Sequence, residues 1–187
     1  MIILGSYGLS YSETRKKIDN YMENKNGRVL IIPIASWYDI GVQEKNYAVS
    51  LGFEANNVTV FDNANAANIM KTDYDYILVP GGNTFKLLYY VKQYGLDEYI
   101  RQQIGKGSVY FGFSAGAYLA CRNIEYVKCF DDNNHISNGD FSALGLTEKY
   151  VLCHFNTRGF EEIKMCRDFI GTEPELVTIN DEDIVAL

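Results

Sequence analysis

Short apolar runs rich in β-branched residues alternate along this chain with stretches in which apolar residues recur at helical spacing. Each apolar run is too short for a helix and is bounded by polar residues, glycine or proline, so we interpret these runs as buried strands. The expected strands are Ile2–Leu4, Val29–Ile34, Val58–Phe61, Tyr76–Val79, Val109–Phe113 and Tyr150–Phe155, followed by a closing pair, Leu176–Ile179 and Ile184–Leu187. The expected helices are 10–23, Val42–Ser50, Ala66–Met70, Phe85–Tyr94, Leu96–Ile104, 114–121 and Phe160–Phe169.

Continuously apolar strands separated by helices are typical of a mostly parallel sheet covered on both faces. We therefore expect an α/β fold with helices on both sides of the sheet. Ligands of such folds bind beyond the carboxyl ends of the strands. Polar residues and glycines gather at or near those ends, at Ser36-Trp37-Tyr38, Gly81-Gly82-Asn83, Ser114 and His154. The sequence therefore predicts a site at this edge of the sheet.

The most informative stretch is Gly112-Phe113-Ser114-Ala115-Gly116, which joins an apolar strand to an Ala/Leu-rich helix. It matches the nucleophile elbow G-x-S-x-G in the context that the motif requires. A serine on so tight a turn presents its hydroxyl outward, and glycines are needed where side chains would collide with the neighbouring strand and helix. We predict that Ser114 is a nucleophile.

A serine nucleophile needs a base, and the chain has only two histidines. His135 lies in a polar stretch, whereas His154 follows an apolar strand that would hold it rigidly, so His154 is the better candidate. The base normally needs a carboxylate to fix its tautomer. Asp131, Asp132, Glu125 and Asp140 all qualify, and spacing alone does not choose among them. For the oxyanion hole, the amide of Ala115 and an amide of the Gly81-Gly82 turn are the natural donors.

The composition narrows the class of protein. At 187 residues the chain fits one domain with a full core. A net charge of −7 argues against nucleic acid or an anionic membrane as partner, and no apolar run approaches the ~20 residues of a membrane span. The four cysteines form no C-x-x-C pair, which favours a reducing cytoplasm, and neither a metal site nor a cofactor is expected.

Four stretches together resemble the peptidase E family of aspartyl dipeptidases, to which cyanophycinase is related. They are Pro80-Gly-Gly-Asn-Thr-Phe-Lys-Leu-Leu88, Gly112-Phe-Ser-Ala-Gly-Ala117, Asn138-Gly-Asp-Phe-Ser-Ala-Leu144 and His154-Phe155. The resemblance implies a class I glutamine-amidotransferase-like fold, with Ser114 as nucleophile and His154 as base. Counting back seven residues from Asn138, as in the family, gives Asp131 as the acid. Because the segment after Ser114 is two residues longer here, Asp132 is the alternative, with Glu125 next.

The resemblance also implies a single domain, 1–187, that is short at its C-terminus relative to the family. It implies a serine peptidase that hydrolyses short peptides, with a preference for dipeptides that begin with aspartate. Ser114, His154 and Asp131 would form the triad, and Gly82 and Ala115 the oxyanion hole. A buried substrate carboxylate needs a cation, for which Arg158 is the candidate, and Asn83 is the other expected substrate-binding residue.

Two rival functions remain at this point. An α/β-hydrolase-type esterase shares the elbow and the order Ser, Asp, His, but this chain is short for that fold and lacks a His-Gly-Gly-Gly segment. A non-catalytic binding protein could also retain the fold. We expect a small peptide as the only partner, and a monomer or homodimer.

Overall fold

The computed structural model describes residues 1–35, 40–172 and 175–187. Its main sheet has six strands in the order β3-β2-β4-β5-β1-β8. Neighbouring strands are parallel except β8, which runs antiparallel to β1. The strands are β1 (Ile2–Gly5), β2 (Val29–Ile31), β3 (Val58–Val60), β4 (Tyr76–Val79), β5 (Val109–Phe113) and β8 (Ile184–Ala186).

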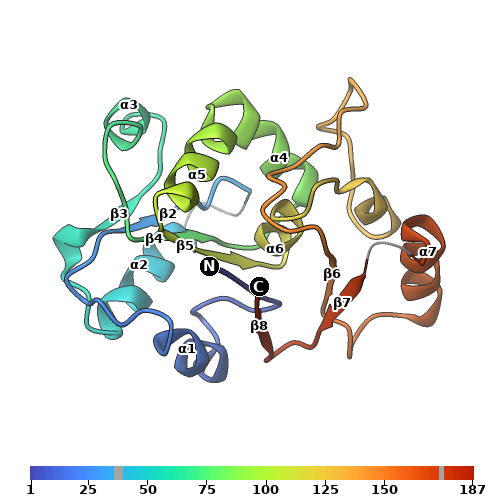
Figure 1. The fold of residues 1–187 in the computed structure, drawn as a ribbon, viewed down its shortest axis with the longest axis horizontal. Coiled ribbons are helices and arrows are strands. Elements are labelled where there is room, and N and C mark those ends of the chain that lie inside the picture. The colour runs from blue at the N-terminus through green and yellow to red at the C-terminus, as the bar shows by residue number, and fades with distance from the viewer. Residues whose placement is uncertain (36–39, 173–174) are drawn as a thin grey trace.

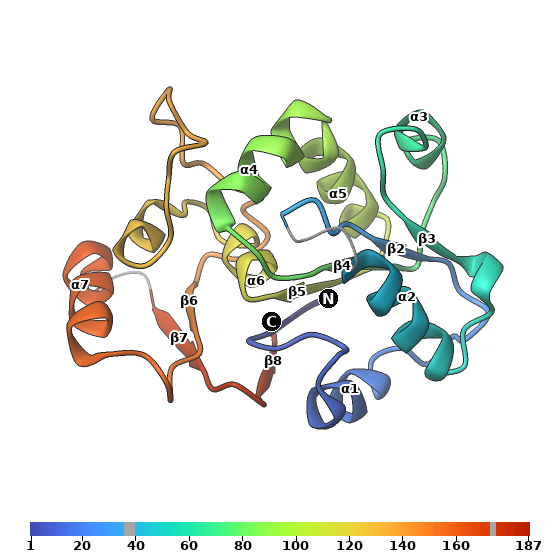
Figure 2. The same ribbon diagram turned by 180° about the vertical axis from the view of Figure 1, so that it is seen from behind.

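Helices cover both faces of this sheet (Figures 1 and 2). Helices α1 (Ser12–Asp19) and α2 (Ile40–Ser50) lie on one face, and the other carries α3 (Ala66–Ile69), α4 (Thr84–Gln93), α5 (Leu96–Gly105) and α6 (Ala115–Leu119). Successive strand residues alternate between the two cores, so that Ile3 and Phe111 face α1 and α2 whereas Leu4 and Tyr110 face the opposite side. The predicted α/β class is confirmed. None of the helices in the described part of the chain is long and apolar enough to cross a membrane.

A second, two-stranded sheet lies beside α6 (Figure 1). Strand β6 (Tyr150–Cys153) pairs in parallel with β7 (Leu176–Ile179), and α7 (Phe160–Ile170) connects them. The two closing strands expected from the sequence are both present, but they lie in different sheets. Strand β8 instead completes the edge of the main sheet, where the backbones of Ile2 and Leu187 exchange two hydrogen bonds.

Ser6 joins the two sheets at their carboxyl ends. Its buried hydroxyl accepts a hydrogen bond from the His154 amide (2.8 Å) and donates one to the Ile179 carbonyl (3.0 Å). Ser6 directly follows β1, and β1 lies next to β5 with Gly5 opposite Phe113. The ends of β5, β6 and β7 therefore meet at one place.

Candidate active site

Ser114 directly follows β5 in a strained conformation, with φ 49° and ψ −108°. A Cβ on Gly112 would lie 2.4 Å from the Gly116 carbonyl oxygen, and one on Gly116 only 2.0 Å from that of Val79. Neither position can hold a side chain without moving backbone, which is the requirement expected of the elbow.

His154 lies one residue beyond β6, with Nε2 3.2 Å from Ser114 Oγ. Among the non-glycine residues that the structure describes, only Ser114 and His154 have positive φ, which is 59° at His154. The backbone amide of His154 is fixed by Ser6, and the ring of Tyr7 packs edge-on against the imidazole at 5.2 Å. The structure thus holds the imidazole against the serine hydroxyl.

The carboxylate beside the imidazole belongs to Asp181, which the sequence reasoning missed. Its Oδ1 lies 2.6 Å from His154 Nδ1, and its side chain is 12% exposed. Asp181 follows β7 by two residues and His154 follows β6 by one; because Cys153 pairs with Ile179, the parallel strands bring the two together. An acid just past a strand end was visible in the sequence, but the pairing of β6 with β7 was not.

Asp131, the predicted acid, does not meet His154. Its Oδ2 accepts hydrogen bonds from the backbone amide (2.8 Å) and hydroxyl (2.5 Å) of Thr84, the first residue of α4. A carboxylate there satisfies a buried helix-terminal amide and interacts favourably with the helix dipole. The expectation that Asp131 lies beside the imidazole is therefore wrong, and Asp181 occupies that place.

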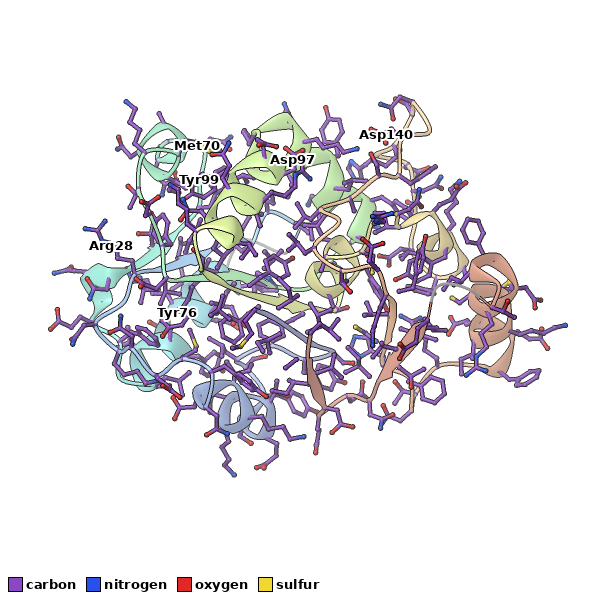
Figure 3. All side chains as sticks on the ribbon, in the orientation of Figure 1. Arg28, Met70, Tyr76, Asp97, Tyr99 and Asp140 are labelled. Carbon is purple, nitrogen blue, oxygen red and sulfur yellow. The ribbon has the colours of Figure 1, made fainter. Side chains whose placement is uncertain are left out.

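The alternative acids are engaged elsewhere. Asp132 binds the amide and side chain of Asn134, and Glu125 pairs with Lys128 at 2.9 Å. Asp140 pairs with Lys92 at 2.6 Å, and Figure 3 shows it on a loop well away from the β6–β7 sheet. None of these acids accepts a hydrogen bond from His154.

A cleft of about 310 Å³ opens in front of Ser114 and His154. The Gly81-Gly82 turn lines it, and a Cβ on Gly81 would lie 3.2 Å from Ser114 Cβ. Gly82 has φ +136°, and a Cβ there would lie 2.4 Å from the Ala35 carbonyl oxygen. The turn thus lies against Ser114, and Ala115 begins α6 directly after this serine. The oxyanion-hole roles of Gly82 and Ala115 stay predictions.

The two predicted substrate-binding side chains are held within the protein. Arg158 donates to the Cys153 carbonyl (2.8 Å) and the Tyr118 hydroxyl (2.9 Å), and its guanidinium carbon lies 3.5 Å from the centre of the Phe130 ring. Asn83 caps α4 by accepting from the Lys86 amide, and its amide nitrogen donates to the Asp132 carbonyl. Neither residue is among the described residues that line the cleft, and their substrate-binding roles stay predictions. Ser36, Trp37 and Tyr38 lie outside the described residues.

Burial also shifts the pKa values of three other titratable groups, two cysteines and a glutamate. Burial raises the pKa of Cys121 to about 11 and that of Cys153 to about 12, so these thiols are unreactive at neutral pH. Glu44, on α2, lines the cleft, and burial raises its pKa to about 7. Within the described ranges, no three His, Cys, Asp or Glu side chains are grouped so as to hold a metal ion.

A parallel α/β sheet with a nucleophile elbow, and an imidazole between serine and carboxylate, is the arrangement of the serine hydrolases. The chain belongs to Peptidase family S51, whose sequence model matches residues 1–187.

Relatives and solved structures agree with this membership. An uncharacterized peptidase of Listeria monocytogenes, Lmo0363, is 36% identical over 113 residues, which cover 59% of this chain and 55% of the relative. Peptidase E of Escherichia coli O6:K15:H31 is 29% identical over 170 residues, or 84% of this chain and 71% of the relative. A crystal structure of a candidate peptidase E from Listeria monocytogenes EGD-e superposes with a TM-score of 0.80 at 27% identity, covering 100% of this chain and 93% of that one.

A peptidase from an acI-B1 actinobacterium shares the fold, with a TM-score of 0.70 at 19% identity over 96% of this chain and 80% of that one. The matches to the first curated relatives span only 43% to 61% of their lengths.

Proposed function

We propose that this protein is a serine peptidase that hydrolyses short peptides through Ser114, His154 and Asp181. The observation that carries the proposal is the unbroken chain of contacts from Asp181 Oδ1 to His154 Nδ1 (2.6 Å) and from His154 Nε2 to Ser114 Oγ (3.2 Å). The site opens into a cleft of about 310 Å³, at the small end of ligand pockets, which span roughly 300–1,000 Å³. A cleft of this size favours very short peptides.

In the proposed reaction, Ser114 Oγ attacks the scissile carbonyl carbon while its proton passes to His154 Nε2. Asp181 holds the proton on Nδ1 and stabilises the imidazolium that forms. The amides of Ala115 and the glycine turn bind the oxyanion. The imidazolium then protonates the leaving amine as the C–N bond breaks, which leaves an acyl-enzyme. A water molecule, deprotonated by the same imidazole, releases the acid product and restores Ser114.

Labelling with a fluorophosphonate and a screen of X-Leu and X-Ala dipeptides test this proposal together. We expect the wild type to be labelled and to hydrolyse dipeptides, and Ser114→Ala to do neither. Labelling with hydrolysis of esters only would identify an esterase. Absence of both labelling and hydrolysis would leave a binding protein. Either result would overturn the proposal.

A preference for N-terminal aspartate is a finer prediction, which the resemblance to the peptidase E family motivates. The described side chains that line the cleft include no lysine or arginine, and Arg158 is bound within the protein. The screen therefore compares Asp-Leu with Asn-Leu, which differ only in charge. A clear advantage of Asp-Leu would support the preference, and equal rates would remove it.

We place this activity in the cytoplasm, because all four cysteines are free thiols. We expect a monomer or homodimer, which size-exclusion chromatography with light scattering would distinguish.

A further inference from the structure

The cleft contains a buried carboxyl group that the proposed reaction does not use. Glu44 lies on α2 and is 4% exposed, and it lines the same cleft as Ser114 and His154. Helix α2 covers the main sheet on the face opposite α4, α5 and α6 (Figure 1). Glu44 therefore reaches the site from a different element than Asp181 does.

The carboxyl group is only partly satisfied. The backbone amide of Leu9 donates a hydrogen bond to it, but the buried Oε2 has no partner among the described residues. Arg15 is near enough to lower the pKa of Glu44 slightly, yet its guanidinium donates to the Leu9 carbonyl and lies over the Tyr47 ring. No ion pair joins Arg15 to Glu44 within the described ranges.

Burial without a partner is costly for a carboxylate, by several kcal/mol when it is charged. Burial accordingly raises the pKa of Glu44 to about 7. A glutamine could accept the same Leu9 hydrogen bond at no electrostatic cost. The contact with Leu9 therefore does not by itself require a group that can carry a negative charge. A carboxyl group in this position fits a site that binds a cationic group of the ligand.

The chemistry of the cleft narrows the identity of that cation. Since the described lining side chains include no lysine or arginine, a cation that contacts Glu44 in the cleft would come from the substrate. The one cation that every unblocked peptide carries, whatever its side chains, is the α-ammonium group. This group is attached to the α-carbon of the first residue. The carbonyl carbon bonded to that α-carbon is the atom that Ser114 would attack. A carboxylate in the same cleft is therefore suited to fix the peptide N-terminus relative to the nucleophile.

We propose that Glu44 is a specificity-determining residue that binds the free α-ammonium group of the peptide, so that only the first peptide bond of an unblocked peptide reaches Ser114. This inference rests on the proposed peptidase activity. In this proposal, Glu44 on α2 recognises the N-terminus of the peptide, whereas His154, which Asp181 orients at the β6–β7 sheet, carries out the proton transfer.

The test compares peptides that differ only at the α-amine, using the best X-Leu dipeptide from the screen, its N-acetyl form and its desamino form. For Ala-Leu the desamino form is propionyl-leucine. We expect wild-type kcat/KM to be at least about 30-fold lower for the desamino and acetyl forms, the smallest loss typical of a buried charge pair left without one partner. The wild-type comparison alone decides the matter if the variants below fail to fold.

Glu44→Gln keeps the shape of the side chain and removes its charge. It should lower kcat/KM for the free dipeptide by a similar factor, leave the rate on the desamino form within twofold, and leave fluorophosphonate labelling of Ser114 unchanged. Glu54→Gln, the same change at an exposed residue just beyond α2, is the matched control and should alter none of these rates.

The contradicting outcomes are distinct. If wild-type protein hydrolyses the free and desamino forms equally, or Glu44→Gln keeps the full preference, this inference is wrong and the peptidase proposal stands. Efficient hydrolysis of N-acetyl-Lys-Leu would instead assign Glu44 to a side-chain cation and overturn it. If Ser114 is labelled but no peptide is hydrolysed, both proposals are wrong.

Discussion

The two sheets differ in what they contribute to the cleft and in how they are held. The main sheet is buried between two layers of helices and presents Ser114 at the end of β5, where the turn is dictated by a few neighbouring residues. The small sheet presents His154 and Asp181, and three of the four residues of β7 are partly or fully exposed. The position of Ser114 thus depends on local backbone geometry, whereas the positions of His154 and Asp181 depend on pairing between distant segments and on Ser6.

The largest expected effect separates the two candidate acids. Asp181→Asn should lower kcat on the order of 10⁴-fold, because the imidazole would lose the group that fixes its tautomer. Asp131→Asn should lower kcat by no more than about tenfold, because the hydrogen bonds of Asp131 go to Thr84 and not to His154. Steady-state kinetics on the best dipeptide measures both, with the exposed Asp168→Asn as control. A greater loss of kcat in Asp131→Asn than in Asp181→Asn would mean that Asp131, and not Asp181, orients the imidazole of His154.

The next largest expected effect is a pH dependence of the free energy of unfolding, which Glu44 on α2 should cause. Its pKa rises from 4.5 to about 7 on folding, so between these values the folded protein binds a proton that the unfolded chain has lost. The contribution of Glu44 is therefore fully present below pH 4.5 and is lost as the pH rises through about 7, a loss of about 3 kcal/mol in the free energy of unfolding.

Urea unfolding at pH 5 and pH 8 measures this contribution when wild type is compared with Glu44→Gln. We expect the wild type to lose about 3 kcal/mol more than the variant over this interval. Equal losses would mean that the carboxyl group is solvated or paired in the free protein.

A smaller effect should follow from breaking the connection between the sheets. Ser6→Ala leaves the half-buried His154 amide and the buried Ile179 carbonyl without their hydroxyl partner, which should cost about 1–3 kcal/mol in the free energy of unfolding. Turnover should fall as well, because His154 loses a contact that holds its backbone. Urea unfolding and kcat measure the two effects, with the exposed Ser50→Ala as control. Lower stability with unchanged kcat would show that the small sheet is positioned without Ser6.

Much of the fold could be predicted because the strands are continuous β-branched runs. Strands β4, β5 and β7 have the predicted limits, and Ser114 was predictable because the elbow places all its requirements within five residues. The pairing of β7 with β6 could not be predicted, because the residue pattern of a β-branched run does not identify the strand with which it pairs. Asp181 was missed for that reason.

Glu44 was missed for a different reason. Helix α2 buries Gly41, Glu44 and Ala48, three residues at helical spacing. The position of Glu44 between the small residues Gly41 and Ala48 at helical spacing was visible in the sequence. It did not reveal burial, because α2 has no clear apolar face that shows which side packs against the sheet. The hydrogen bonds of Arg158 and Asn83 to backbone could not be predicted either, because proximity in sequence to Ser114 or His154 does not reveal which side chains bind backbone.

The most direct test of the account is the NMR signal of the proton on His154 Nδ1. In a His135→Gln background His154 is the only histidine, and a hydrogen bond of 2.6 Å to a carboxylate should shift this proton far downfield and protect it from exchange. Because Asp181 accepts this hydrogen bond and Asp131 does not, we expect the resonance to persist in Asp131→Asn and to disappear in Asp181→Asn. A resonance that survives in Asp181→Asn and disappears in Asp131→Asn would contradict it.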